Sequence, residues 1–303
     1  MTAVEKKTKS EPSLAEKMRA RLNEKAGKEL VSAEADKTQV DSWIEMSQDF
    51  KDIVGGEGLP QGHITQFFSE NPDSGKTTAL ITAMIATAQQ GGIVNLIDSE
   101  QKFPWDRYEL MGGNKEDVNH IVVDSLEEAW DAWDSLGKVA LEMREEGFEG
   151  PILAAWDSIP SSVPDAIMGE KESGKAHVAV EAKINNKNVR KLRQIIRRAK
   201  LTAVFINHSY WSMPQFPQRP VEILKGGTEM YFMTTLAIRF NKGKKLDRDF
   251  KGEKQRIGQT VHVEVKKGHF SGRTIKKTLN IIDRGFVSDD ELKDYKAALK
   301  GKI

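Results

Sequence analysis

The sequence of 303 residues contains no cysteine, which excludes disulfides, thiolate metal sites and thiol nucleophiles together. It also lacks any apolar run near the ~20 residues that a membrane-spanning helix needs, and its charged N-terminal stretch does not resemble a signal peptide. The formal net charge is only +1, so nucleic-acid binding would have to rely on local basic groups. We therefore expect a cytoplasmic protein without a membrane role.

What the sequence does contain is an alternation of short apolar runs with helix-like stretches, which predicts an α/β fold with buried parallel strands. The expected strands are 64–68, 93–97, 121–123, 152–156 and 203–206. The expected helices are 77–90, 126–140 and a long helix that ends near Lys200. Three strand-like segments then follow without helices, at 235–240, 261–266 and 274–282. They predict an antiparallel extension at the edge of a mostly parallel central sheet.

The N-terminal part lies outside this alternation. Ser13 precedes an apolar series of Leu14, Met18 and Leu22, and Glu16 stands three positions after the serine. This spacing predicts a capping box that opens a short amphipathic helix. We expect an N-terminal segment at 1–50, a core at 51–286 and a C-terminal tail at 287–303.

A phosphate-binding signature follows the first expected core strand. Ser74-Gly75-Lys76-Thr77-Thr78 opens a helix, which is the context in which GxxxxGK[ST] binds nucleotide phosphates and Mg²⁺. Lys76 is expected to reach the β- and γ-phosphates and Thr77 to bind Mg²⁺. The assigned nucleotide contacts are Asn71, Pro72, Asp73, Ser74, Gly75, Lys76, Thr77 and Thr78. Glu70 replaces the first glycine of the signature, although it disfavours positive φ and brings a negative charge near the phosphates.

Two carboxylates are expected to join this loop. Asp157 ends an apolar strand and is assigned to Mg²⁺ with Thr77, although a strand-end aspartate that caps a turn is the alternative interpretation. Glu100 follows the strand that ends at Asp98, and we assign it, rather than Asp98, to polarise the water that attacks the γ-phosphate.

Taken in order, these motifs resemble the RecA-like recombinases and, within that family, the phage UvsX-type recombinases. The motifs that carry the likeness are GGEGLPQG at 55–62, LIDSE at 96–100, WDS at 156–158, FINH at 205–208 and GGT at 226–228. The histidine of FINH replaces a glutamine, as in the UvsX branch. The likeness extends from about Gly55 to Phe286.

This resemblance implies a RecA-type P-loop NTPase core, ATP and Mg²⁺ as cofactors, and DNA-dependent hydrolysis of ATP to ADP and phosphate. It implies catalytic roles for Glu100 and Lys76, and for His208 as a γ-phosphate sensor, although a lone histidine here would more often be structural. Residues 265–270 resemble the segment that inserts a basic residue into the neighbouring subunit's ATP site, which assigns Lys267 and, more weakly, His269. Tyr108 is assigned to the adenine because Arg107 occupies the position of the expected tyrosine.

Two loops, at 160–177 and 209–225, correspond to the DNA-binding loops of the family. The second combines aromatic and basic residues, a composition suited to base stacking and phosphate contact. The assigned DNA-binding residues are Tyr210, Trp211, Phe216, Arg219, Lys225, Gly226 and Gly227. A loop that packs back on its own domain is the alternative.

The resemblance further implies single-stranded DNA and homologous duplex DNA as partners, with the segment 1–50 supporting self-association into a helical filament. The expected role is homologous pairing and strand exchange in recombination and repair, in a bacterial host's cytoplasm if the protein is phage-encoded. One alternative is an ATP-gated single-stranded DNA binding or annealing protein that does not exchange strands. Another is a RecA-fold helicase, which would need an arginine finger and usually a further domain.

Overall fold

The computed structural model describes residues 12–27, 40–167, 175–213, 219–250, 252–268 and 275–300. The chain divides into two compact units, 1–41 and 42–303. The first unit contains helix α1 (Leu14–Ala26), which opens with the predicted capping box: the Glu16 N–H donates to Ser13 Oγ at 3.2 Å, and the Ser13 N–H donates to Glu16 Oε2 at 2.6 Å. Leu14 and Met18 are exposed on this helix.

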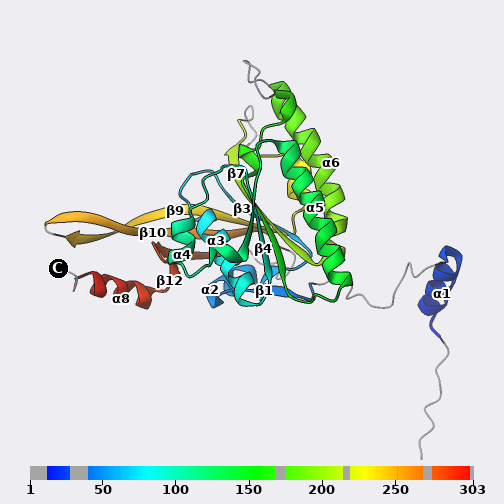
Figure 1. Ribbon diagram of the computed structural model, residues 1–303, viewed down its shortest axis with the longest axis horizontal. Helices are drawn as coiled ribbons and strands as arrows, with labels where there is room; N and C mark the ends of the chain where they lie inside the picture. Colours follow the sequence, from blue (N-terminus) through cyan, green and yellow to red (C-terminus); the bar gives the residue numbers. More distant parts are fainter. Residues whose placement is uncertain are drawn as a thin grey trace, which may run out of the picture. The chain divides into compact units, whose positions relative to one another are not determined.

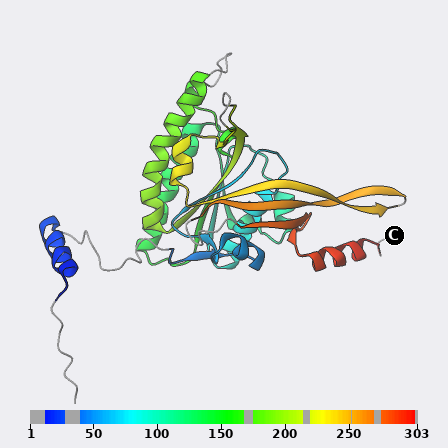
Figure 2. The ribbon, with the colours of Figure 1, turned by 180° about the vertical axis from the view of Figure 1, so that it is seen from behind.

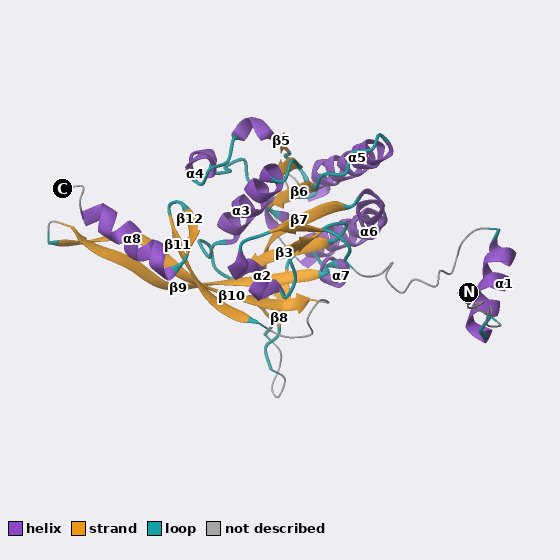
Figure 3. Ribbon diagram, turned by 90° about the horizontal axis from the view of Figure 1, so that it is seen from below, coloured by secondary structure: helices purple, strands orange, loops and turns teal. Residues whose placement is uncertain are grey.

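The second unit is built around one large mixed sheet (Figures 1 and 3). Its strands lie in the order β12-β11-β10-β9-β3-β7-β6-β4-β5, with β8 paired to β7. The pairs from β9 to β5 are parallel, whereas β9 to β12 pair antiparallel, which confirms the predicted parallel sheet with an antiparallel extension. The strands of the sheet are β3 (Ile64–Ser69), β4 (Ile93–Asp98), β5 (Val118–Val122), β6 (Ile152–Asp157), β7 (Leu201–Trp211), β8 (Glu222–Leu224), β9 (Leu236–Phe250), β10 (Glu253–Gly268), β11 (Lys276–Ile282) and β12 (Gly285–Val287).

Helices cover both faces of this sheet (Figures 1 and 2). One apolar cluster joins α2 and α3 to the sheet, and a second joins α5, α6 and α7 to the opposite face. The helices of the unit are α2 (Gln48–Val54), α3 (Lys76–Gln89), α4 (Trp105–Leu110), α5 (Leu126–Glu145), α6 (Lys175–Ala199), α7 (Thr228–Met233) and α8 (Asp289–Lys300). Short 3₁₀ helices occupy η2 (Lys115–Asp117), η3 (Ile159–Ser161) and η4 (Asp165–Ile167). All residues of β3 and β6 are buried, as expected of strands covered on both faces.

The larger unit begins before the expected boundary at residue 50, which falls inside α2. The short strand β1 (Trp43–Glu45) pairs antiparallel with β2 (Gly58–Pro60), and Lys277 of β11 forms ion pairs with Asp49 at 2.6 Å and Asp52 at 3.0 Å. These contacts join residues 42–54 to the core. The expected tail contains the helix α8, and no described helix combines the length and apolar character needed to cross a bilayer.

Candidate nucleotide and DNA sites

The phosphate loop connects the end of β3 to the start of α3. Gly75 caps α3 in the left-handed region with φ of 97°, and Asp73 shares this region with φ of 53°. Among the described non-glycine residues, positive φ occurs at Asp73, Gln101 and Lys200. Glu70 therefore needs no glycine-like backbone, and the conflict expected from its side chain at this position does not arise.

A cavity of about 390 Å³ opens beside this loop. Asp73 to Thr78 line it, so the N-terminus of α3 presents its free N–H groups to the space where phosphates would bind. Asn71 and Pro72 are exposed and do not line the cavity. Arg107, Arg256 and Asp283 line it beyond the phosphate loop.

The Lys76 side chain is buried, with 6% of its surface exposed. Its Nζ donates two long hydrogen bonds, to the Asn71 carbonyl and to Ser74 Oγ, each at 3.4 Å. Burial lowers the pKa of Lys76, while nearby carboxylates, Asp157 first, oppose the shift. Both of these hydrogen bonds are long and go to neutral oxygens, so an added anion would stabilise the buried ammonium group, and the site fits a nucleotide phosphate.

The Asp157 carboxyl group ends β6 beside Asp98 of β4, with which it is in register. Burial raises the pKa of Asp157 to about 7, and the negative charges of Glu100 and Asp98 reinforce the shift. A divalent cation would offset this accumulation of negative charge, and carboxylate and hydroxyl oxygens are ligands that Mg²⁺ prefers. Asp157 and the half-buried Thr77 offer oxygen donors of the type that fits Mg²⁺, and Thr77 lines the cavity beside the phosphate loop.

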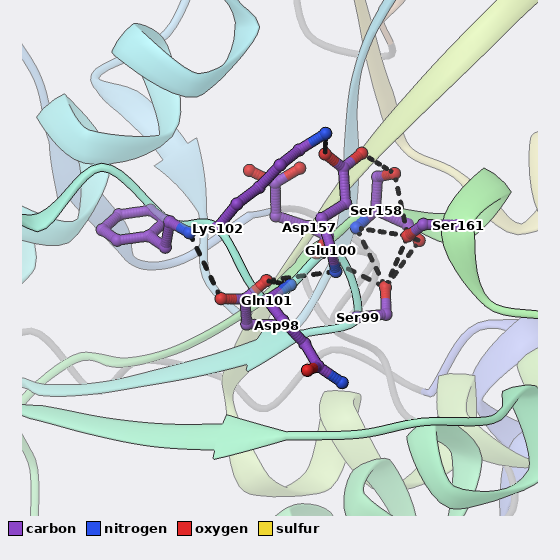
Figure 4. A network of polar contacts seen from close by, with 9 residues as sticks. Asp98, Ser99, Glu100, Gln101, Lys102, Asp157, Ser158 and Ser161 are labelled. Atoms are coloured by element: carbon purple, nitrogen blue, oxygen red, sulfur yellow. Dashed lines mark hydrogen bonds and ion pairs between the residues drawn. The ribbon is translucent and has the colours of Figure 1, made fainter.

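The Glu100 carboxylate is held from two sides (Figure 4). Ser158 Oγ donates to it at 2.7 Å and Lys102 Nζ forms an ion pair at 2.8 Å. Burial alone would raise the pKa of Glu100, but the hydrogen bonds from Lys102 and Ser158 together lower it, which keeps the carboxylate able to accept a proton. Asp98 instead accepts N–H groups of Glu100 and Gln101 at 3.1 and 2.8 Å, so its local role is structural.

A serine network that the sequence did not indicate supports Glu100. Ser158 Oγ lies 3.2 Å from Ser161 Oγ, which lies 2.7 Å from Ser99 Oγ (Figure 4). Ser99 and Ser158 directly follow β4 and β6, a position that could have suggested them, whereas Ser161 ends the short helix η3.

His208 lies on β7 in register with Ser69, the last residue of β3. Burial lowers the pKa of His208, and the positive charges of Lys76 and Lys225 add to the shift, which favours the neutral imidazole. The Lys225 N–H donates to the His208 carbonyl at 2.9 Å, and Asn207 Nδ2 donates to the Lys225 carbonyl at 3.0 Å. The predicted phosphate sensor is thus hydrogen-bonded to the end of the predicted DNA loop.

Tyr108 does not reach the cavity, contrary to its assignment to the adenine. Its side chain is fully buried on α4 against the rings of Phe103 and Trp105. Arg107 lines the cavity instead, and its Nη2 donates to the Ile282 carbonyl at 3.2 Å. The packing of the aromatic residues sets the rotation of this short helix, which the sequence alone did not resolve.

The predicted second DNA loop begins as an extension of β7, which pairs antiparallel with β8. Tyr210 and Trp211 on this extension are 45% and 42% exposed, and Arg219 and Lys225 are exposed as well. Phe216 lies outside the described residues, as do residues 168–174 of the first loop. The four assigned side chains that the structure describes in this loop are therefore accessible to solvent.

Gly226 and Gly227 connect β8 to α7 and both have positive φ, 87° and 96°. A Cβ on Gly227 would lie 2.8 Å from Asn186 Oδ1 and 3.3 Å from the Ala182 Cα of α6. The glycines thus set the path of the backbone and the approach of α7 to α6, which differs from a direct side-chain contact with DNA.

Lys267 lies near the end of β10. Its Nζ donates to the carbonyls of Tyr231 and Phe232 at 2.8 and 3.0 Å, at the C-terminal end of α7. Neither partner belongs to the phosphate loop of the same chain. His269 lies outside the described residues.

Comparison with protein families gives a match to the RecA N-terminal domain over residues 15–285. The chain belongs to the RecA family. Among its relatives, the RecA protein of Leptospira meyeri is 27% identical over 221 residues, which cover 73% of the chain and 53% of the relative. RecA of Treponema pallidum is 27% identical over 255 residues, covering 83% and 58%. RecA of Listeria monocytogenes serotype 4a is 28% identical over 206 residues, covering 67% and 56%.

The chain spans about half the length of the curated RecA proteins that it matches. The RecA-family match includes the phosphate loop, both carboxylates, His208 and the stem of the second loop. The likeness to the UvsX branch rests on the residue at His208 and stays a prediction.

Proposed function

We propose that this RecA-family protein is an ATP-dependent recombinase that assembles on single-stranded DNA and promotes pairing and strand exchange with homologous duplex DNA. The observation that carries the proposal is the position of His208 between the two sites. His208 is in register with Ser69, the last residue before the phosphate loop, and its carbonyl accepts the N–H of Lys225 at 2.9 Å.

In this proposal ATP supplies the phosphoryl group and Mg²⁺ neutralises its charge. Lys76 and the N–H groups at the start of α3 bind the phosphates, while Thr77 and deprotonated Asp157 hold the cation. Glu100, oriented by Ser158 and Lys102, accepts a proton from the attacking water.

DNA contact is proposed for the exposed residues of the second loop. The rings of Tyr210 and Trp211 stack on bases, at about 1–3 kcal/mol for each stacked base, while Arg219 and Lys225 contact phosphates. The half exposure of both rings supports this role. Neutral His208 can donate one hydrogen bond to a phosphate oxygen, and its backbone bond to Lys225 passes the resulting shift to the loop.

Lys267 is proposed to act in the ATP site of an adjacent subunit of a filament. To do so it must leave the carbonyls of Tyr231 and Phe232, to which it is bonded within its own chain. Turnover then depends on assembly, because the positive charge that stabilises the transferred phosphoryl group comes from a second chain.

The test measures ATP hydrolysis with and without single-stranded DNA, followed by joint-molecule formation between that DNA and a homologous duplex. We expect DNA-stimulated hydrolysis and joint molecules from the wild type, and a loss of hydrolysis of about 100-fold or more from Lys76→Ala. Pairing of complementary single strands alone would indicate an annealing protein, and unwinding of duplex DNA would indicate a helicase. A rate of ATP hydrolysis that does not change when single-stranded DNA is added would contradict the recombinase proposal.

A further inference from the structure

A direct hydrogen bond joins the phosphate loop to the stem of the second loop. Trp211 Nε1 donates to Glu70 Oε2 at 3.0 Å, across 141 residues of sequence. Glu70 is the first residue after β3, and Trp211 is the last residue of β7. This contact is separate from the backbone bond between His208 and Lys225.

The indole of Trp211 is held on a second side by a cation. The Arg239 guanidinium lies 5.6 Å from the ring centroid, and its Nε forms an ion pair with Glu222 at 3.1 Å. Ser209 Oγ donates to Glu222 at 2.7 Å, which fixes that carboxylate to β7. The Trp211 ring, which we assign to base stacking, is therefore restrained by Glu70 at its N–H and by Arg239 at one face, although 42% of the residue is exposed.

We propose that Glu70 is a positioning residue for Trp211 and that it makes DNA affinity depend on nucleotide. The coupling presupposes the proposed binding of ATP and single-stranded DNA. Without nucleotide, the Glu70 carboxylate holds the indole in a position that competes with base stacking. Phosphates bound at Lys76 place negative charge beside the loop that carries Glu70, and repulsion displaces the carboxylate and releases Trp211.

This mechanism gives the acidic side chain at the first signature position a role that glycine could not fill. The coupling is also reciprocal. A base stacked on Trp211 frees Glu70, so bound DNA should raise the affinity for nucleotide by the same factor as bound nucleotide raises the affinity for DNA. Three variants separate its parts: Glu70→Ala removes the acceptor, Glu70→Gln keeps an acceptor but removes the charge, and Trp211→Phe keeps a ring but removes the donor.

The experiment measures the dissociation constant of a labelled oligo-dT strand with and without a non-hydrolysable ATP analogue. The gain is the factor by which the ATP analogue raises the affinity for the DNA strand. For Glu70→Ala we expect the DNA affinity without nucleotide to rise about fivefold and the gain to shrink by the same factor. Glu70→Gln should keep nucleotide-free affinity near the wild-type value, because the amide oxygen still accepts from Nε1, yet show a reduced gain. Trp211→Phe should reduce the gain equally, and Glu70→Ala combined with it should reduce the gain no further.

Asp131→Ala, at an exposed position on α5, is the matched control and should retain the wild-type gain. Thermal unfolding of each variant verifies folding, and the nearly isosteric Glu70→Gln keeps the test valid if Glu70→Ala is unstable. A wild-type gain that Glu70→Ala and Glu70→Gln both preserve would overturn the coupling alone. A wild type that binds no single-stranded DNA in either state would overturn the coupling and the proposed function together.

Discussion

The Asp157 carboxyl group must release a proton before it can hold a cation, because its pKa is raised to about 7 from an ordinary value of 3.8. Protonation of Asp157 stabilises the folded state. This contribution to the free energy of unfolding is fully present below about pH 4 and is lost as the pH rises through about 7. We therefore expect Asp157→Asn to increase the free energy of unfolding at pH 8 by an amount on the order of 1–3 kcal/mol, measured by urea denaturation. The same variant should lose Mg²⁺-dependent hydrolysis.

The pH dependence supplies the control for this prediction. The stabilisation by Asp157→Asn should shrink toward zero as the pH falls below 3.8, where the carboxyl becomes protonated in both the folded and the unfolded state. Asp131→Asn on the surface of α5 should show neither effect. An equal stabilisation at both pH values would mean that the charge of Asp157 is not its cause.

Arg107 and Tyr108 are neighbours with opposite environments, and their variants should differ accordingly. Arg107→Ala removes a side chain that lines the nucleotide cavity, so we expect KM for ATP to rise about tenfold with kcat nearly unchanged. Tyr108→Phe removes a buried hydroxyl that has no hydrogen-bond partner among the described residues, so it should preserve KM and not reduce stability. A higher KM for Tyr108→Phe alone would restore Tyr108 to the nucleotide site.

The sequence could predict the placement of Lys76 and Asp157 because a strand end and a helix start fix each position. The sequence could not predict that Arg107 lines the cavity while Tyr108 is buried. Which face of the short α4 is buried depends on the packing of Tyr108 against Phe103 and Trp105. The sequence also could not predict the hydrogen bond between Glu70 and Trp211, since it joins the residue after β3 to the last residue of β7, 141 positions away.

At the scale of elements, the connection from β8 to α7 depends on glycine. Gly227→Ala would place a Cβ against Asn186 and Ala182 of α6 while straining a backbone with φ of 96°. We expect the free energy of unfolding to fall by about 2–3 kcal/mol and single-stranded DNA affinity to weaken, because α7 and the loop end would shift. Urea denaturation and DNA titration measure the two effects.

Gly91→Ala is the control that separates backbone strain at positive φ from the steric contact of the new Cβ. Gly91 has φ of 69°, but a Cβ there would meet no atom within 4 Å. It should lose only about 1 kcal/mol and keep wild-type DNA affinity. Equal losses at both glycines would mean that the approach of α7 to α6 does not matter.

The elements themselves were predictable where their apolar pattern was regular, as in the buried β6. The hairpin of β9 and β10 was predicted too short, because its outer half is mostly charged and polar (Figure 1). Its apolar residues Leu246, Phe250 and Ile257 are too widely spaced to form an apolar run. β1 and the first three residues of α2 lie before the expected core of 51–286. The contacts that join them to the core, such as that of Asp49 with Lys277, are made with distant parts of the chain.

At the scale of the whole molecule, parallel strands bring the chemistry to one edge of the sheet. The ends of β3, β6 and β7 carry the phosphate loop, Asp157 and the stem of the DNA loop, and β7 lies between the other two. The proposed nucleotide and DNA sites therefore lie on neighbouring strands, β3 and β7. Lys267 differs, because its hydrogen bonds to described residues of its own chain are to α7 and not to the phosphate loop.

This placement leads to a prediction about assembly. If Lys267 acts in an adjacent subunit's site, Lys76→Ala and Lys267→Ala should each lose DNA-stimulated hydrolysis, whereas a mixture should regain part of it. A subunit with intact Lys76 beside one with intact Lys267 forms a complete site, and random head-to-tail assembly gives about one such interface in four. We expect turnover of up to about a quarter of the wild-type rate in an equimolar mixture, measured with single-stranded DNA in excess. If Lys267 only stabilises α7 through Tyr231 and Phe232, its loss disables its own chain and mixing recovers nothing.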